Sequence, residues 1–261
     1  MYGLEDIDRE IEQTRDFQQI DGEGLSQADY AYLDEALETQ DSDFIVDRID
    51  EMFDYHPPKA IDSYPEISEM VEPIKDQIDS KYLEAPNDME QVGQISEKMI
   101  GIEGTRFEDW KNLTPQERLE AMQKVENAAA EVAHRPACRV RAEDMEPGQY
   151  GYYSSRDNTI TLNSYYIEGC DYESYKQCMD TIIHEGRHAY QHYNVEIRQV
   201  HPSDGDCKNW DENLNEVALF PEYYGYQVAD EVGPLRYWMQ PVEADARAFA
   251  ADVFNQFNKM A

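Results

Sequence analysis

The chain has few basic residues, few cysteines and no long apolar run. Its 261 residues contain 22 Lys and Arg against 56 Asp and Glu, which leaves a formal net charge of −34. Nucleic acids and anionic membrane surfaces attract proteins through basic residues, so this deficit argues against both as partners. No segment is apolar for long enough to cross a bilayer, and residues 1–8 contain neither the basic nor the apolar part of a secretion signal. We therefore expect a soluble protein that is cytoplasmic, or exported without a standard signal peptide.

Cysteine is too scarce here to form the framework of a small secreted domain. The four cysteines are Cys138, Cys170, Cys178 and Cys207. No two of them form a C-x-x-C pair, the spacing typical of metal-binding or redox sites. We expect reduced thiols, with two disulfide bridges as the alternative.

Acidic residues are concentrated in the first part of the chain. Residues 1–100 carry 28 acidic and 7 basic residues, a net charge of −21, whereas residues 101–261 carry 28 and 15, a net charge of −13. Apolar residues at helical spacing predict five short amphipathic helices, near residues 4–17, 26–37, 45–53, 67–82 and 92–99. We predict an acidic, all-helical region over residues 1–100. It would be a solvated surface, a docking surface for a basic protein, or a segment that covers an active site.

The loop between the first two predicted helices has some features of a calcium site. Asp21-Gly22-Glu23-Gly24 lies between helical flanks, as the loop of an EF-hand does. No register, however, places Asp or Asn at positions 1, 3 and 5 together with Gly at 6 and Glu at 12. The pattern therefore favours a glycine-rich turn between helices.

The character of the chain changes after Gly101, and we predict a second domain over residues 101–261. Thr114-Pro115-Gln116-Glu117 is typical of a helix start, with Thr114 as N-cap and Glu117 closing a capping box. This helix should stop near Arg135-Pro136. A candidate strand follows at residues 138–140. Residues 150–153 and 159–163 then predict a β-hairpin with a polar turn, whose edge could bind an extended peptide.

The clearest chemical signal is His184-Glu185-Gly186-Arg187-His188, which has the form H-E-x-x-H. On a helix, two histidines four residues apart lie on one face and can hold one Zn²⁺, with the glutamate beside the open position of the metal. Apolar residues on both sides of the motif predict that this helix is buried, where unpartnered histidines would be costly. The sequence therefore predicts a catalytic zinc site.

A catalytic zinc ion normally has three protein ligands and one water. His192 is about 12 Å from His184 along a straight helix, too far for both to bind one metal. His201 lies in a polar loop, and the residues after the motif do not continue a metzincin pattern. Two acidic residues are candidates for the third ligand: Glu216, and Glu243 in the first turn of a helix that starts at Pro241.

Together, residues 184–188 and the stretch Pro241-Val242-Glu243-Ala244-Asp245-Ala246-Arg247-Ala248-Phe249-Ala250 resemble the HExxH zinc metallopeptidases of gluzincin type. The similarity is greatest to the compact ImmA/IrrE-like and bacterial polymorphic-toxin metallopeptidases, and it covers roughly residues 105–261. In that family a later helix of the form E-x-(E/D)-A-x-x-F-A supplies the third ligand. The resemblance implies that Glu243 is this ligand and that Asp245 is a hydrogen-bonding partner of a ligand histidine. Glu243 lies 55 residues beyond His188, a longer spacing than in the best-known gluzincins, and this keeps Glu216 as a competitor.

These observations predict a predominantly helical α+β fold. A zincin-like domain with a small antiparallel sheet beside the HExxH helix would follow the acidic helical region. The expected activity is hydrolysis of peptide bonds in a protein or peptide substrate by a zinc-activated water, with Glu185 as general base. Tyr237 is the candidate for stabilising the oxyanion, ahead of Tyr223 and Tyr224. The alternatives are a zinc hydrolase of non-peptide amides and a non-catalytic acidic interaction module with a vestigial or structural metal site.

Overall fold

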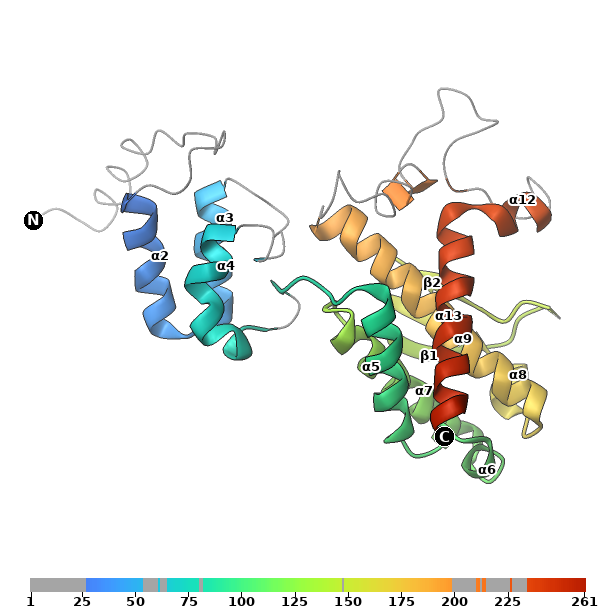
Figure 1. Cartoon of the computed structure of the whole chain (residues 1–261). Helices are drawn as coiled ribbons and strands as arrows, with labels where there is room; N and C mark the ends of the chain where they lie inside the picture. Colours follow the sequence, from blue (N-terminus) through green and yellow to red (C-terminus); the bar gives the residue numbers. More distant parts are fainter. Residues whose placement is uncertain are drawn as a thin grey trace, which may run out of the picture. The chain divides into compact units, whose positions relative to one another are not determined.

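A computed structural model describes residues 27–53, 61, 65–79, 82–146, 148–198, 210, 211, 213, 214, 226 and 234–261. The chain divides into two compact units, Met1–Tyr82 and Leu83–Ala261 (Figure 1). None of the described helices is both long enough and apolar enough to span a bilayer. The fold is α+β and mostly helical, as predicted from the sequence.

The first unit contains α2 (Gln27–Thr39), α3 (Ser42–Phe53), α4 (Pro65–Val71) and the 3₁₀ helix η2 (Glu72–Gln77). Its buried residues stand at helical spacing. They include Leu33, Ala36, Ile45, Ile49, Ile67 and Val71. The described acidic side chains of α2 and α3 are exposed, namely Asp34, Glu35, Glu38, Asp43 and Asp47. A basic partner for them stays a prediction. The predicted helix at residues 4–17 and the loop near Asp21 lie outside the described residues.

The helix predicted over residues 67–82 is interrupted. The α-helix ends at Val71 and a 3₁₀ helix begins at Glu72, with Pro73 in its first turn. Proline has no backbone N–H and its ring clashes with the preceding turn, so an α-helix does not continue through it.

The second unit begins before the predicted boundary at residue 100. Helix α5 (Asp88–Ile100) packs against α7 (Pro115–Val132) and α13 (Pro241–Met260). The hydroxyl of Ser96 on α5 donates to the carbonyl of Val253 on α13 at 3.1 Å. Because the buried face of α5 is covered by this unit, residues 88–100 fold with it and not with the acidic helices. Asn87 is the N-cap of α5, and its side chain accepts from the backbone of Glu90.

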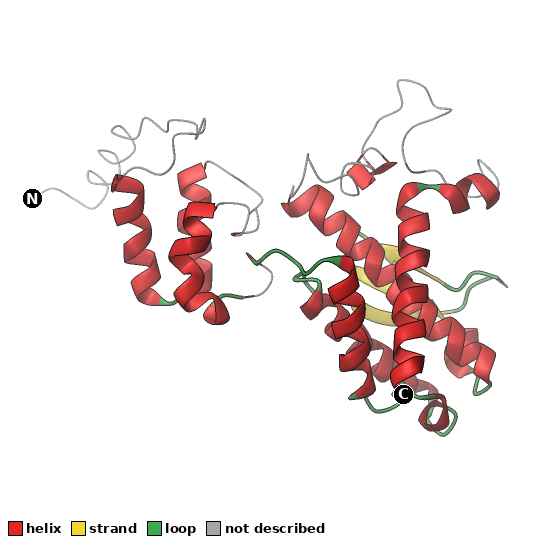
Figure 2. Ribbon diagram, viewed as in Figure 1, coloured by secondary structure: helices red, strands yellow, loops and turns green. Residues whose placement is uncertain are grey.

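A three-stranded sheet lies among the helices of the second unit (Figure 2). Its strands are β1 (Arg139–Glu143), β2 (Gly151–Ser154) and β3 (Thr159–Asn163), in the order β1-β3-β2. The predicted hairpin is confirmed, since β2 and β3 pair antiparallel. The prediction of a purely antiparallel sheet is wrong, because β1 pairs parallel to β3. β3 lies between the other two strands, and all five of its residues are buried.

The hydrophobic core of this unit is built around α9 (Tyr172–His192). This helix packs against α7, α13, β2 and β3, and the short helices α6 (Phe107–Trp110) and α8 (Ser164–Glu168) cover its N-terminal half. The predicted start of α7 is confirmed. Thr114 caps the helix, Pro115 is its first residue, and Glu117 completes the capping box. The unit also contains the π-helix η4 (Tyr193–Arg198) and α12 (Pro234–Met239), and Trp210, Asp211, Asn213 and Leu214 are helical as well.

Candidate metal centre

The HExxH motif lies in the second half of α9, in a regular helix. The helix begins at Asp171, whose side chain caps the backbone N–H of Ser174 at 2.9 Å. Ile182, Ile183 and Ala189 are buried on both sides of the motif, as the sequence pattern predicted. His184 and His188 are therefore neighbours on one face of a packed helix, and their rings lie 4.7 Å apart.

Helix α13 brings Glu243 to these two histidines. His184 Nε2 lies 3.4 Å from Glu243 Oε2, and His188 Nε2 lies 3.5 Å from Glu243 Oε1. The two histidine Nε2 atoms are 3.0 Å apart. Two atoms that each bind a tetrahedral zinc ion at about 2.0–2.1 Å stand about 3.3 Å from each other. The three residues could thus hold a metal ion, and among the described residues no other group of three His, Cys, Asp or Glu could do so.

The start of α13 explains why Glu243 is available. Pro241 is the first helical residue and Glu243 lies in the first turn, where the helix dipole favours a negative charge. Burial alone would raise the pKa of Glu243, but hydrogen bonds from the two ligand histidines outweigh it and hold the pKa well below its usual range. The buried carboxylate is therefore ionised, as a metal ligand must be. The competing residue Glu216 lies outside the described residues.

His188 is held in a strongly anionic environment. Burial would lower its pKa, but the hydrogen bond with Glu243 and the charges of Glu185 and Glu243 raise the pKa to about 9. Without a metal, this imidazole therefore carries a proton at neutral pH. A divalent cation would replace that proton and satisfy the same carboxylates.

Gln191 links His188 to α13. His188 Nδ1 lies 2.8 Å from Gln191 Oε1, while Gln191 Nε2 donates to the carbonyl of Val242 at 2.9 Å and to Asp245 Oδ2 at 2.7 Å. The predicted direct bond from Asp245 to a ligand histidine is thus replaced by an indirect one, because the fully buried Gln191 lies between them. Sequence reasoning missed Gln191. Its position could have indicated this contact, because residues three apart on a helix are neighbours on its surface.

The direct partner of Asp245 is Arg187, one of the two variable residues of the motif. Arg187 donates to Asp245 through Nε at 2.8 Å and through Nη2 at 3.0 Å, and Nη2 also donates to Asp88 at 2.8 Å. Its guanidinium lies over the rings of Tyr190, Trp210 and Phe249. Arg187 thereby ties α9 to α5 and α13 behind the ligand histidines.

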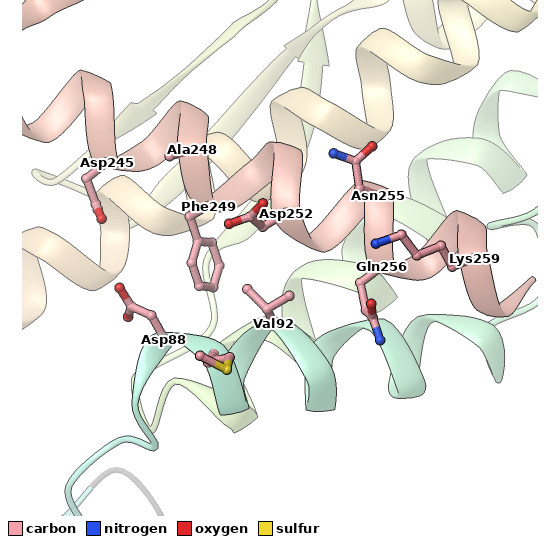
Figure 3. Close-up of a pocket in the computed structure, with 10 residues that line it drawn as sticks. Asp88, Val92, Asp245, Ala248, Phe249, Asp252, Asn255, Gln256 and Lys259 are labelled. Carbon is pink, nitrogen blue, oxygen red and sulfur yellow. The ribbon is translucent and has the colours of Figure 1, made fainter.

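Asp88 and Asp245 also line a groove of about 700 Å³ along α5 and α13. Figure 3 shows these two carboxylates at one end of the groove and Lys259 at the other, with Phe249 and Val92 between them. Both carboxylates at this end of the groove already accept hydrogen bonds from Arg187, so they help to pack the helices around the candidate site.

Glu185 is a buried carboxylate in the HExxH motif. It is 8 % exposed, and within the described part of the chain no hydrogen bond or ion pair engages its carboxylate. Its charge contributes to the raised pKa of His188 and of Tyr237. This environment contrasts with that of Glu243, whose oxygens are both engaged.

Two tyrosines stand beside Glu243. Tyr226 donates to Glu243 Oε1 at 2.7 Å, and its hydroxyl lies 3.3 Å from that of the predicted residue Tyr237. Burial raises the pKa of both hydroxyls, so both are protonated donors at neutral pH. Sequence reasoning missed Tyr226, because nothing local distinguishes it among 19 tyrosines. Tyr223 and Tyr224 lie outside the described residues.

Gly186 allows a buried ion pair to approach the motif. Arg135 donates to Glu126 at 2.6 and 2.9 Å, both side chains are almost completely buried, and Glu126 also accepts from the backbone of Cys138. A Cβ at Gly186 would stand 3.0 Å from Glu126 Oε2 and 3.1 Å from Arg135 Nη2. The lack of a side chain at Gly186 therefore leaves room for this ion pair to pack against the helix.

His192 lies outside the ligand group, as expected. Its Nδ1 is 3.0 Å from Glu196 Oε1, and its ring packs against Tyr153. His201 lies outside the described residues.

Comparison of the chain with models of protein families, with curated proteins and with solved structures gave no match. The resemblance to gluzincin-type metallopeptidases therefore stays a prediction. What the structure defines is a mostly helical α+β chain in which two histidines and one glutamate can hold a metal ion.

Proposed function

We propose that the chain is a zinc-dependent hydrolase of peptide bonds, with His184, His188 and Glu243 as the zinc ligands. The observation that carries the proposal is the spacing of their ligand atoms, 3.0, 3.4 and 3.5 Å, which suits tetrahedral zinc. Two neutral nitrogen donors and one carboxylate are a ligand set that zinc favours in hydrolases. A zinc ion bound there would polarise a carbonyl and lower the pKa of a water to about 7.

Glu185 would act as the general base. Its carboxylate is buried beside the ligands and is not engaged by any described residue, so it can take a proton from the attacking water. The same carboxyl group would then give that proton to the leaving amine. Proton transfer of this kind contributes roughly 10²- to 10⁴-fold to a rate.

Tyr237 would donate a hydrogen bond to the oxygen that becomes negative as the carbonyl is attacked, and Tyr226 would give its single hydroxyl proton to Glu243. Their hydroxyls are next to each other and next to Glu243, and their raised pKa keeps the donor protons in place. Tyr226 is the new member of this pair. Its bond to Glu243 also orients the ligand carboxylate.

The number of ligands favours this proposal over a structural metal site. A structural zinc ion is enclosed by four protein ligands, whereas a catalytic one keeps a position for water. The described residues offer three ligands, and His184 and His188 each retain some exposed side-chain surface. Hydrolysis of a non-peptide amide would use the same groups, and the substrate assay below separates the two.

The test combines metal content with cleavage by the purified full chain. We expect about one zinc ion per chain by elemental analysis, lost or much weakened in His184→Ala, His188→Ala and Glu243→Ala. A fluorescence-quenched peptide library is the substrate, with small aryl amides as the non-peptide control. Glu185→Gln should keep zinc and lose most hydrolysis.

Each result has a distinct meaning. Wild-type protein without zinc after metal loading would overturn the proposal. If Glu243→Ala retains zinc, Glu243 is not the third ligand and the assignment moves to Glu216. Undiminished cleavage by Glu185→Gln would remove Glu185 as the base, and cleavage of aryl amides alone would overturn the peptidase assignment.

A further inference from the structure

A cationic side chain lies one helical turn beyond the third ligand. Arg247 follows Glu243 by four residues on α13, which corresponds to about 6 Å along the helix axis. Its guanidinium stands 4.0 Å from the ring centroid of Trp238, and it donates a hydrogen bond to the backbone carbonyl of that residue. Trp238 is in α12, which precedes α13 directly (Figure 1). The two contacts hold the guanidinium at the end of α13 that carries the ligand.

The described contacts of this guanidinium are both made with Trp238. Arg247 is half-buried, yet in the part of the chain that the structure describes no Asp or Glu forms an ion pair with it. Burial lowers its pKa, and the nearby charge of Glu243 only partly offsets the effect. Among the buried arginines, Arg135 and Arg187 are paired with carboxylates, whereas Arg118, like Arg247, donates to backbone carbonyls.

The surroundings of Arg247 suit a peptide. Trp238 and Met239 are 55 % and 66 % exposed, although both are large apolar residues. They precede the ligand helix and adjoin Tyr237, whose hydroxyl is close to the metal ligands. A cation in this position can bind an anionic group of a substrate, while apolar groups of the same substrate pack against Trp238 and Met239.

We propose that Arg247, held over Trp238, binds a carboxylate of the peptide substrate and so selects acidic peptides for cleavage. The inference rests on the proposed hydrolase function and names the substrate class of that site. A planar guanidinium can bind a carboxylate through two parallel hydrogen bonds, which a lysine cannot reproduce. The carboxylate can come from the C-terminus of the substrate or from an Asp or Glu side chain near the scissile bond.

The experiment measures the binding of three dipeptides with an N-terminal hydroxamate, a group that chelates zinc. One is a neutral amide, the second has a free C-terminal carboxylate, and the third is an amide with a glutamate side chain. Calorimetry with the zinc-loaded full chain gives the affinity ratio of each acidic probe to the neutral one. We expect at least one acidic probe to bind about tenfold tighter than the neutral probe. The acidic probe that binds more tightly than the neutral one identifies the source of the carboxylate.

The variants separate a specific contact from general charge. Arg247→Met should abolish the preference and leave the affinity for the neutral probe unchanged, and Arg247→Lys should restore part of it. Lys259→Met removes the same charge from the same helix but lies about 24 Å from Glu243 along the axis, so the preference should persist. Zinc content and thermal unfolding of each variant show that the fold is intact.

The outcomes distinguish this inference from the function on which it rests. If the wild type binds no zinc or no neutral hydroxamate, the proposed function fails. If the neutral probe binds and neither acidic probe gains, or if Arg247→Met keeps the preference, only the role of Arg247 is overturned.

Discussion

The Nδ1 atom of His188 lies 2.8 Å from the side-chain oxygen of Gln191, and this contact determines which nitrogen can bind a metal. The amide of Gln191 can be oriented in only one way, because its Nε2 faces two groups that accept hydrogen bonds, the carbonyl of Val242 and the carboxylate of Asp245. Its oxygen must therefore face His188, whose Nδ1 carries the proton. The other nitrogen, Nε2, is left for the metal.

Replacing Gln191 should weaken zinc binding without removing a ligand. We expect Gln191→Leu to lower zinc affinity roughly 10- to 100-fold, because His188 loses the bond that sets its tautomer and ring orientation. Competition with a chromophoric chelator measures the affinity. Gln177→Leu is the matched control, since Gln177 lies on the same helix and bonds only to the exposed Glu173. Equal zinc affinity in the two variants would refute the orienting role of Gln191.

Arg187 should matter for stability more than for ligation. Arg187→Met removes both bonds to Asp245 and leaves this carboxylate without its cation, which should lower the free energy of unfolding by about 3–5 kcal/mol. Asp88→Asn removes the charge of a half-exposed carboxylate and should cost less than about 1 kcal/mol. Urea unfolding of both variants measures the difference. A loss of similar size in the two would contradict the central role of the pair formed by Arg187 and Asp245.

Gly186 and Gly93 should respond to alanine with opposite signs. Both lie in helix interiors, where alanine is favoured over glycine by about 1 kcal/mol. A Cβ at Gly93 meets nothing within 4 Å, so Gly93→Ala should stabilise the protein by roughly that amount. A Cβ at Gly186 meets the buried pair of Glu126 and Arg135, which is held from several sides, and Gly186→Ala should cost about 1–3 kcal/mol. Thermal unfolding followed by circular dichroism checks both signs. Stabilisation by Gly186→Ala would show that Glu126 and Arg135 can move aside for the added Cβ.

The cysteines should differ sharply in reactivity. Cys138 and Cys178 are buried, and burial raises the pKa of both thiols far above the usual value, so almost no thiolate is present near pH 8. Cys170 is exposed. In a Cys207→Ser background, iodoacetamide at pH 8 should modify Cys170 first and the two buried thiols only after denaturation. Mass spectrometry of peptides from timed samples gives the order, and early modification of Cys178 would contradict the packing of α9.

Among the described residues, Cys138, Cys170 and Cys178 form no disulfide bridge. Cys207 lies outside the described residues. Some local features were predictable. The capping box at Thr114 and the hairpin of β2 and β3 depend on residues close together in the chain, and both are confirmed. The parallel pairing of β1 with β3 could not be predicted from the sequence, because the partner of a strand in a sheet depends on packing between segments that are far apart in the chain.

The sequence by itself determined that His184 and His188 share one face of a buried helix, because a spacing of four residues has that consequence in any α-helix. It left the third ligand open between Glu216 and Glu243. Only the tertiary structure decided that Glu243 completes a group with both histidines, and that Gln191 separates Asp245 from His188. It also decided that Tyr226 donates to Glu243 and that the guanidinium of Arg247 lies over the ring of Trp238. The reason is physical: these relations join α9 to segments that follow it by tens of residues, and such contacts depend on how α13 packs against α9.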